Sequence, residues 1–582
     1  MKNTTFCLFL LFFLNGLFAQ NYTDYIGAGH NEGLVITTSH NQSADMTGNK
    51  SADGFPVTDV ELLADASRFL AQASLGYDYE MIQMTAAMGY EAWLDEQFTL
   101  PQQSITEQML VIASYYADPG EEGIPTASMR EFRSAWWENS MKNSDLLRHK
   151  INYIFSQIFV VSAFGSDLFE DIGYLSSSYY DMLGQNTFGN YRKLLNDVSR
   201  HVSMGLYLNH LNNPKSNPAQ NIHPDENYAR EVMQLFSIGL YELNPDGSRK
   251  LDGNGKFIPT YNNDDIREFA KIFTGFGDGH PESLWGEPFG EHDIALSANT
   301  PMKMYEEWHE SGPKVLLNGQ TVPAGQTGLQ DFNDAMDNLH NHPNIGPFIG
   351  KALIQFLVSA NPSPAYIGRV TNSFNNNGAG VRGDLQAVIK AILLDPEARD
   401  CNALANPTAG KLREPIVRYS HVLQAFHAYR PIFTTDMENW YSATGQVPMY
   451  SSSVFNFYQP EFQPNGPVAN QGLFAPVFQI HNSSTSVGFI NEVDNWTFSN
   501  EPMIFLDDAG ADTLLDLSTE LAIADSPTEL VDHLDLLLAA GQLSTHAKTT
   551  IIQAVSQLSA PEDRVRMAVY LILISPDFAF LK

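Results

Sequence analysis

The sequence predicts a mainly α-helical protein, with a large irregular body of many helices, one or two small β-hairpins and long loops rich in Gly, Pro and aromatic residues. Three observations predict this class. The chain has 582 residues, of which 43% are hydrophobic and 12% aromatic, so it can bury a large core. Apolar residues recur at helical spacing along most of its length, and strand patterns are scarce. Because one core seldom serves more than about 300 residues, we expect residues 59–582 to form two packed lobes.

The N-terminus has the features of a secretion signal. Lys2 precedes an apolar run over residues 6–14, and the small residue Ala19 follows a few positions later. The apolar run is shorter than the roughly 20 residues that a membrane-spanning helix needs. We therefore predict a signal peptide over residues 1–19, export to the periplasm or the cell exterior, and no membrane span.

Residues 20–58 are rich in Asn, Gly, Ser, Thr and Asp and contain few apolar anchors, which predicts a flexible leader. After removal of the signal peptide, Cys401 is the one cysteine that remains in the chain. A single thiol cannot form an internal disulfide, so packing has to stabilise the body.

Beyond residue 59, apolar residues at three-and-four spacing predict helices in the following order. The expected helices cover residues 60–73, 91–98, 129–139, 191–204, 225–238, 264–274, 332–340, 345–358, 385–394 and 416–426, with three more between 528 and 574.

Turn residues predict the two hairpins and the two long loops. Asp246-Gly247 and Asp252-Gly253 favour a hairpin over residues 243–261, and Asn318-Gly319 favours one over residues 314–322. The segments 275–313 and 444–500 lack helical spacing and are loaded with Gly, Pro, Asn and aromatic residues. Long loops of this kind in a compact protein often have a function.

Charge and motif content exclude several classes of protein. The chain has 67 acidic and 33 basic residues, and a net charge of -34 repels nucleic acid phosphates, so we expect no nucleic acid partner. The sequence contains no phosphate-binding loop, no dinucleotide fingerprint, no His-Glu-x-x-His and no Gly-x-Ser-x-Gly motif. Nucleotide-dependent enzymes and ordinary zinc proteases are therefore disfavoured, and we expect no cofactor.

The densest cluster of reactive side chains lies in the expected helix 225–238. At about 100° per residue, one helix face is apolar and the other is polar. The polar face carries Glu226, Asn227, Arg230, Glu231 and Gln234. Two interpretations stay open: a carboxylate pair for acid and base chemistry, or a structural polar network between helices in which arginine keeps the carboxylates ionised.

With its neighbours, this cluster resembles the signature of the bacterial family known as domain of unknown function 1800. The segments that carry the resemblance are residues 66–76, 89–94, 225–231, 234–239, 265–276, 308–314, 342–343, 411–415 and 574–578, so it extends over roughly 60–582. The sequence has Glu310 where the family motif has aspartate. The resemblance implies export and no particular activity. It also implies, through gene neighbourhood, a co-exported sulfatase-like partner of the family known as domain of unknown function 1501.

His309 could act as a base, a proton donor or a ligand, since it lies beside Glu310 in the long loop 275–313. Because the histidines of this loop do not have a helical ligand spacing, we predict no metal site. The candidate catalytic residues are therefore Glu226, Arg230, Glu231 and His309, and the candidate binding residues are Asn227, Gln234, Trp308, Glu310 and Lys314.

Two functions are consistent with these residues. We favour a non-catalytic envelope or extracellular component that binds a partner, because the motifs are explained by packing as readily as by catalysis. The alternative is a hydrolase or lyase that acts on an extracellular polymer, with polysaccharide as the favoured polymer, through a Glu/Arg/His site. For that site we expect helices 225–238 and 264–274 to pack side by side, with His309 within reach of the carboxylates.

Overall fold

The computed structural model describes residues 59–117, 125–400, 406, 408–428, 438–498 and 515–582. The expected signal peptide 1–19, the expected leader 20–58 and Cys401 lie outside these residues.

The described chain is mainly α-helical, as predicted. The α-helices are α1 (Val60–Ala73), α2 (Tyr79–Met88), α3 (Tyr90–Thr99), α4 (Ile105–Tyr116), α5 (Met129–Lys142), α6 (Leu146–Ile158), α7 (Asp167–Asp171), α8 (Gly173–Asn186), α9 (Tyr191–Arg200), α10 (Val202–Tyr207), α11 (Asn227–Gln234), α12 (Asn263–Ile272), α13 (Ile294–Asn299), α14 (Gly328–Asn341), α15 (Ile345–Leu357), α16 (Pro364–Asn375), α17 (Leu385–Leu393), α18 (Pro396–Arg399), α19 (Pro415–Ala425), α20 (Glu438–Thr444), α21 (Pro467–Asn470), α22 (Ser483–Phe498), α23 (Ser518–Ile523), α24 (Pro527–Ala539), α25 (Thr545–Ser556), α26 (Pro561–Leu573) and α27 (Pro576–Ala579). Short 3-10 helices are η1 (Pro218–Gln220), η2 (Glu306–Trp308), η3 (Leu317–Gly319) and η5 (Pro476–Gln479). The strands are β1 (Phe276–Gly277), β2 (Lys303–Met304), β3 (Lys314–Val315), β4 (Thr321–Val322), β5 (Lys411–Leu412) and β6 (Phe580–Leu581).

Capping residues set several helix boundaries. The Asp59 side chain accepts the N–H groups of Glu61 and Leu62 at 3.0 and 3.3 Å, so α1 begins where predicted. The expected helix 191–204 is instead interrupted at His201, whose ring accepts the N–H of Ser203 at 3.2 Å and starts α10. This side-chain cap competes with continuation of the helix, and apolar spacing does not reveal it.

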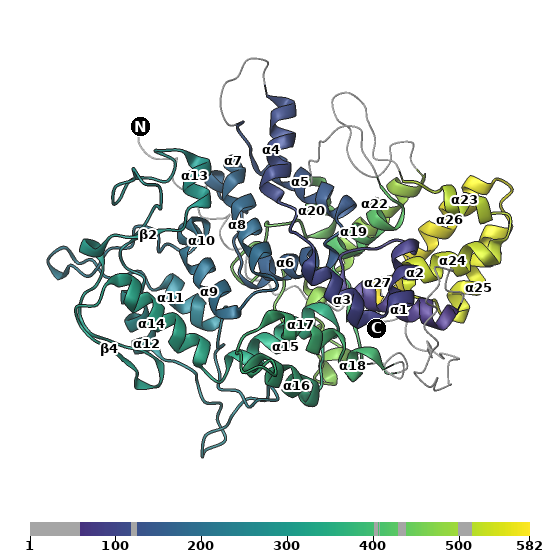
Figure 1. Ribbon diagram of the computed structural model, residues 1–582. Coiled ribbons are helices and arrows are strands. Elements are labelled where there is room, and N and C mark those ends of the chain that lie inside the picture. Colours follow the sequence, from purple (N-terminus) through teal and green to yellow (C-terminus); the bar gives the residue numbers. More distant parts are fainter. Residues whose placement is uncertain (1–58, 118–124, 401–405, 407, 429–437, 499–514) are drawn as a thin grey trace, which may run out of the picture.

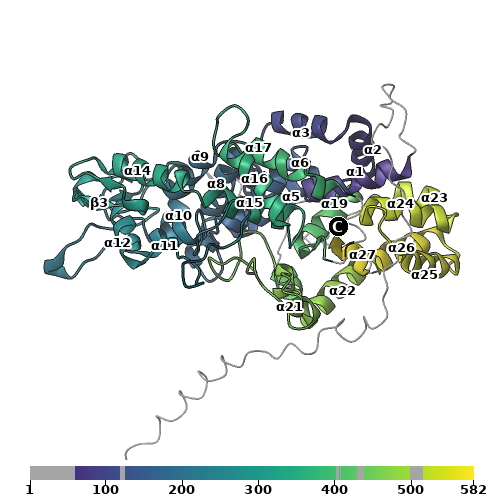
Figure 2. The ribbon, with the colours of Figure 1, turned by 90° about the horizontal axis from the view of Figure 1, so that it is seen from below.

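The two ends of the described chain meet. Helix α1 packs against α24 and against β6, the last strand, which pairs with β5 in antiparallel register, with Lys411 opposite Leu581. Figures 1 and 2 show α1 and α2 beside the C-terminal helices α23 to α26. Gly76 lies at a close approach in this region, because a Cβ there would come within 2.7 Å of the carbonyl oxygen of Ser420.

The hairpin predicted over residues 314–322 forms, and the segment 243–261 folds as two consecutive turns. Strands β3 and β4 pair around Asn318 and Gly319, both of which have positive φ, as a tight hairpin turn requires. Residues 243–261 form isolated antiparallel bridges, with Leu243 opposite Arg249 and Leu251 opposite Phe257.

The two expected loops contain short elements. The first, 275–313, contains β1, α13, β2 and η2. In the second, 444–500, the prediction of continuous loop is wrong, because α22 occupies Ser483–Phe498 and packs against α20 and α26. Contacts with these neighbours stabilise α22 although its apolar spacing is weak.

The buried apolar side chains form one continuous cluster that extends from Leu63 to Leu581. The expected division into two lobes stays a prediction. Among the helices of the described residues, none combines the length and the hydrophobicity that crossing a bilayer requires. In Figure 1, helices α9 to α14 and the short strands β2 and β4 lie at the end of the molecule opposite α23 to α26, and this end carries the candidate residues.

Candidate functional site

Helices α11 and α12 pack side by side, as predicted from the short connection between them. Tyr228 of α11 anchors this packing. Its hydroxyl donates to Ser199 Oγ at 2.6 Å, and its ring stacks on His210 with centroids 3.9 Å apart. The ring of Phe273, just after α12, meets Tyr228 edge-on at 4.8 Å. The apolar face of α11 is thereby fixed in the core.

The five polar side chains expected to form one cluster on α11 instead make separate contacts, of which the one between Arg230 and Glu226 is long and exposed. Arg230 Nη2 lies 3.4 Å from Glu226 Oε2, and the two side chains are 41% and 40% exposed. Asn227, in the first turn, donates its backbone N–H to Asp225 Oδ1 at 2.8 Å. Gln234 accepts the hydroxyl of Tyr261 at 3.2 Å. These residues form a solvated surface and not a sealed network.

Glu231 differs from its neighbours on the helix. It is only 5% exposed, and its buried Oε2 atom has no hydrogen-bond partner among the described residues. Burial raises the pKa of the Glu231 carboxyl, while the Arg230 guanidinium opposes the shift. Tyr261 lies close to this carboxyl: burial and then the Glu231 charge raise the pKa of its phenol to about 12. A carboxyl whose pKa is raised by burial is a candidate general acid.

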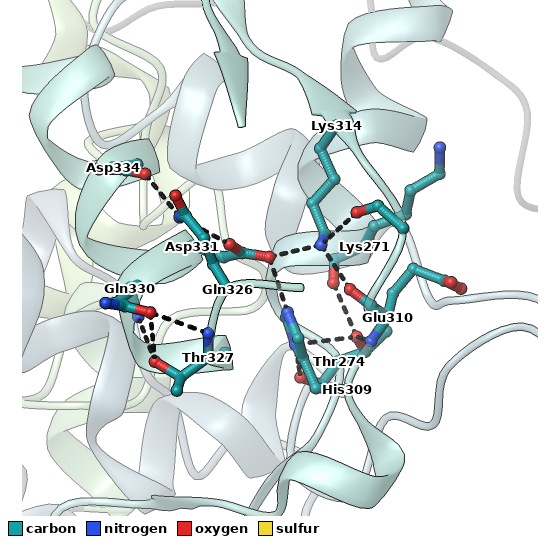
Figure 3. A network of polar contacts seen from close by, with 12 residues as sticks. Lys271, Thr274, His309, Glu310, Lys314, Gln326, Thr327, Gln330, Asp331 and Asp334 are labelled. Atoms are coloured by element: carbon teal, nitrogen blue, oxygen red, sulfur yellow. Dashed lines mark hydrogen bonds and ion pairs between the residues drawn. The ribbon is translucent and has the colours of Figure 1, made fainter. Parts of the chain in front are cut away.

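His309 belongs to a separate, sealed network (Figure 3). Its ring is 2% exposed, with Nδ1 2.9 Å from the Thr274 carbonyl oxygen and Nε2 3.0 Å from Asp331 Oδ2. The Thr274 hydroxyl donates to the Lys271 carbonyl at 2.7 Å and accepts the N–H of Glu310 at 2.9 Å. Both ring nitrogens of His309 therefore already contact oxygen atoms of this network.

Lys314 completes this network from the other side of Asp331. Its ammonium lies 2.5 Å from Asp331 Oδ2 and also donates to the carbonyls of Glu310 and Gly312. The second carboxylate oxygen of Asp331 accepts the Gln326 amide at 3.0 Å. Lys314 and Asp331 are each 1% exposed, so the ion pair is shielded from water.

The remaining two candidates hold the loop against residues 215–216. Glu310 Oε2 accepts the backbone N–H of Ser216 at 3.2 Å. The carbonyl oxygen of Trp308 accepts the backbone N–H of Lys215 at 2.9 Å. The Trp308 ring is 37% exposed and stacks on Trp285 with centroids 5.1 Å apart and planes 9° apart. Trp308 is thus accessible, whereas Lys314 is not.

The structure therefore divides the candidates into two sets. The first set is Asn227, Arg230, Glu231 and Gln234 on α11, with Glu226 at its N-cap. In the second set His309 and Lys314 contact Asp331, and Trp308 and Glu310 lie beside His309 in the loop. Within the described part of the chain, no hydrogen bond or ion pair joins Glu231 to His309.

Sequence reasoning did not identify Tyr261 or Asp331. Asp331 lies one residue before the helix predicted over 332–340, in the first turn of α14. The capping box formed by Thr327 and Gln330 marks the true start of α14 and would have included Asp331 in the helix.

Comparison with known proteins gives a family and no activity. The family model described as "Protein of unknown function (DUF1800)" matches residues 68–580. No curated protein and no solved structure matches the chain.

Proposed function

Because this chain belongs to the DUF1800 family, whose description names no activity, we propose a function from the site itself. The protein is an exported, non-catalytic envelope or extracellular component that binds a partner protein. A sulfatase-like protein of the family known as domain of unknown function 1501 is the first partner to test.

The observation that best supports the non-catalytic function is that His309, the candidate proton carrier, is buried and already hydrogen-bonded. Its exposed fraction is 2%, and both nitrogens already contact acceptors within the network of Asp331 and Thr274. A substrate would have to break these bonds to reach the ring. Such a network instead stabilises the loop 275–313 against α12 and α14.

The surface that this network supports is suited to binding. Trp308 and Trp285 stack near the surface, and the neighbouring Leu284 is 67% exposed. Glu306 and Glu307 are exposed beside Trp308. Tryptophan is frequent among residues that dominate binding energy, and the acidic rim favours a partner with a basic surface.

Binding of the purified chain to this sulfatase-like protein, measured by isothermal titration calorimetry, tests the proposal. We expect saturable binding that Trp308→Ala weakens at least about tenfold, since buried tryptophans at interfaces often contribute more than 1.4 kcal/mol. Phe455→Ala is the matched control, because Phe455 is 45% exposed and lies outside the loop 275–313. Absence of binding, or equal binding by the two variants, would contradict the proposal.

A second function is favoured by Glu231: a hydrolase or lyase acting on an extracellular polysaccharide. Its buried carboxyl has an unpartnered oxygen and a pKa raised by burial, as a general acid requires. A screen of polysaccharides for new reducing ends or for unsaturated products tests this function. Activity that is lost in Glu231→Gln and kept in Glu226→Gln would support the enzyme. If no polymer gives a product, the enzymatic function is contradicted and the binding function is favoured.

A further inference from the structure

A cluster of possible metal ligands lies in the loop between β1 and α13, apart from both candidate sets. His280, Glu282 and His292 each place one ligand atom within 4.8 Å of the others. Glu287 joins the group through His292, whose Nε2 lies 3.2 Å from Glu287 Oε2. None of these residues belongs to the His309 network or to α11.

The backbone around His280 is held in place. Asp278 accepts the N–H of His280 at 3.0 Å, and its other oxygen accepts the hydroxyls of Ser283 and Ser297, each at 3.0 Å. The Lys303 ammonium donates to the carbonyls of His280 and Ser283 at 2.9 and 2.8 Å. His280 is 7% exposed, so this histidine is positioned before any ligand arrives.

Glu287 contacts the Nε2 side of the His292 ring. The Glu287 carboxylate also accepts the N–H of Leu284 at 2.8 Å, which holds it in place behind His292. With Nε2 directed at Glu287, the ring presents its Nδ1 atom to the rest of the cluster. A carboxylate behind a histidine is the arrangement that orients histidines toward metals.

His292 Nδ1 lies near a second carboxylate. Glu282 Oε2 lies 3.9 Å from this nitrogen, too far for a hydrogen bond. Zinc binds nitrogen and oxygen ligands at about 2.0–2.2 Å, so two ligands of one tetrahedral ion lie about 3.3–3.6 Å apart. The separation of these two atoms is a few tenths of an ångström longer, so a small side-chain movement brings both onto one ion.

His280 supplies the third ligand after a small rearrangement. Its Nδ1 now accepts the N–H of Glu282 at 3.2 Å, and its ring lies parallel to that of His292, with centroids 4.9 Å apart and planes 6° apart. An ion has to lie near the plane of each ring, so binding turns the His292 ring, whose side chain is 25% exposed.

We propose that His280, Glu282 and His292 bind one divalent transition-metal ion, for which Zn²⁺ is the best match, with Glu287 orienting His292. Imidazole and carboxylate are typical zinc ligands, and three protein ligands leave a fourth position for water. The two glutamates supply two negative charges against the two charges of the ion. The other interpretation of the cluster is a metal-free charge pair in which a protonated His292 bridges Glu282 and Glu287.

Calorimetric titration of the full chain with ZnCl₂ tests this proposal, after treatment with a chelator and without a polyhistidine tag. We expect one saturable site. His292→Ala should weaken binding at least tenfold, and Glu287→Gln should weaken it about 10- to 100-fold, the effect usual for a residue that orients a metal ligand. Both positions are partly exposed, with side-chain exposures of 25% and 32%, so these variants should fold even if His280→Ala does not.

His546→Ala, which removes an exposed histidine on α25, is the matched control and should bind Zn²⁺ like the wild type. Co²⁺ provides a second readout, because a tetrahedral site with nitrogen ligands gives visible absorption bands that His292→Ala should abolish. Absence of a saturable site, or equal affinity in His292→Ala and the control, would overturn the proposal in favour of the charge pair.

Discussion

His309 Nε2 lies 3.0 Å from Asp331 Oδ2, and both side chains are 2% exposed. Lys314 Nζ lies 2.5 Å from the same oxygen. One carboxylate atom of α14 therefore binds both the His309 ring of the loop and the Lys314 ammonium of β3. This oxygen is one of the points at which the loop 275–313 is attached to the helical body, besides the contacts of Trp308 and Glu310 with residues 215–216.

Asp331→Ala should reduce the free energy of unfolding by roughly 3–5 kcal/mol, because it leaves the buried Lys314 ammonium without its carboxylate. Denaturant unfolding followed by circular dichroism measures this change. Asp337→Ala on the same helix is the control. Asp337 is 58% exposed in its ion pair with Arg192, so its removal should cost about 0–1 kcal/mol. Equal losses in the two variants would show that the Asp331 network does not stabilise the fold.

Arg230→Ala should lower the free energy of unfolding by no more than about 1 kcal/mol. Its contact with Glu226 is 3.4 Å long and both side chains are about two-fifths exposed, so water screens the pair. Burial of this pair would have predicted a loss of several kcal/mol. A thermal melt of the variant within a few degrees of the wild type is the expected result, and a large drop would indicate a buried role for Arg230.

Glu231 should make stability fall as pH rises. Because burial raises the pKa of Glu231 in the folded state, the folded protein binds more protons than the unfolded one between the ordinary carboxyl pKa of about 4.5 and the raised value. Each pH unit inside that window should then cost up to about 1.4 kcal/mol from this group. Glu231→Gln should remove this contribution, measured as the difference in unfolding free energy between pH 4.5 and pH 7; an unchanged difference would contradict it.

Two buried histidines should make the free energy of unfolding decrease in acid. Burial lowers the pKa of His149 and of His201 from 6.5 to about 3. The unfolded chain therefore binds more protons than the folded one between these values, and stability is lost as pH falls from 6.5 toward 3. We expect His149→Gln to reduce the slope of unfolding free energy against pH in this window by up to about 1.4 kcal/mol per unit. The Ser140 hydroxyl, which now accepts the ring N–H at 2.9 Å, can bind the glutamine amide instead.

Much of the fold follows from local sequence. The capping aspartate before Val60 and the apolar spacing after it determine α1, and Asn318-Gly319 determines the turn between β3 and β4. These features depend on interactions between residues a few positions apart, so a sequence pattern contains them. The neighbourhood of α11 and α12 also follows, because the connection between them is short.

The burial of individual polar groups was decided by the tertiary structure. Arg230 and Glu231 are adjacent in sequence and lie on one predicted polar face, yet the Arg230 side chain is 41% exposed and Glu231 is 5% exposed. The helical spacing gives the direction of each side chain. The elements that pack over the polar face determine which of the two side chains is shielded from solvent. For the same reason the sequence could not distinguish a reactive His309 from a sealed one, because Asp331 approaches it from another helix.

The sequence by itself thus determined the helical class, the family, the turns of both predicted hairpin segments and the pairing of α11 with α12. Only the tertiary structure decided that Glu231 and His309 are buried, and brought His280 to His292 across a loop without helical spacing. The physical reason is the distance along the chain over which each interaction acts. Helix propensity, capping and turn preferences depend on residues that are close in sequence. Desolvation and the meeting of distant ligands depend on how the whole chain packs.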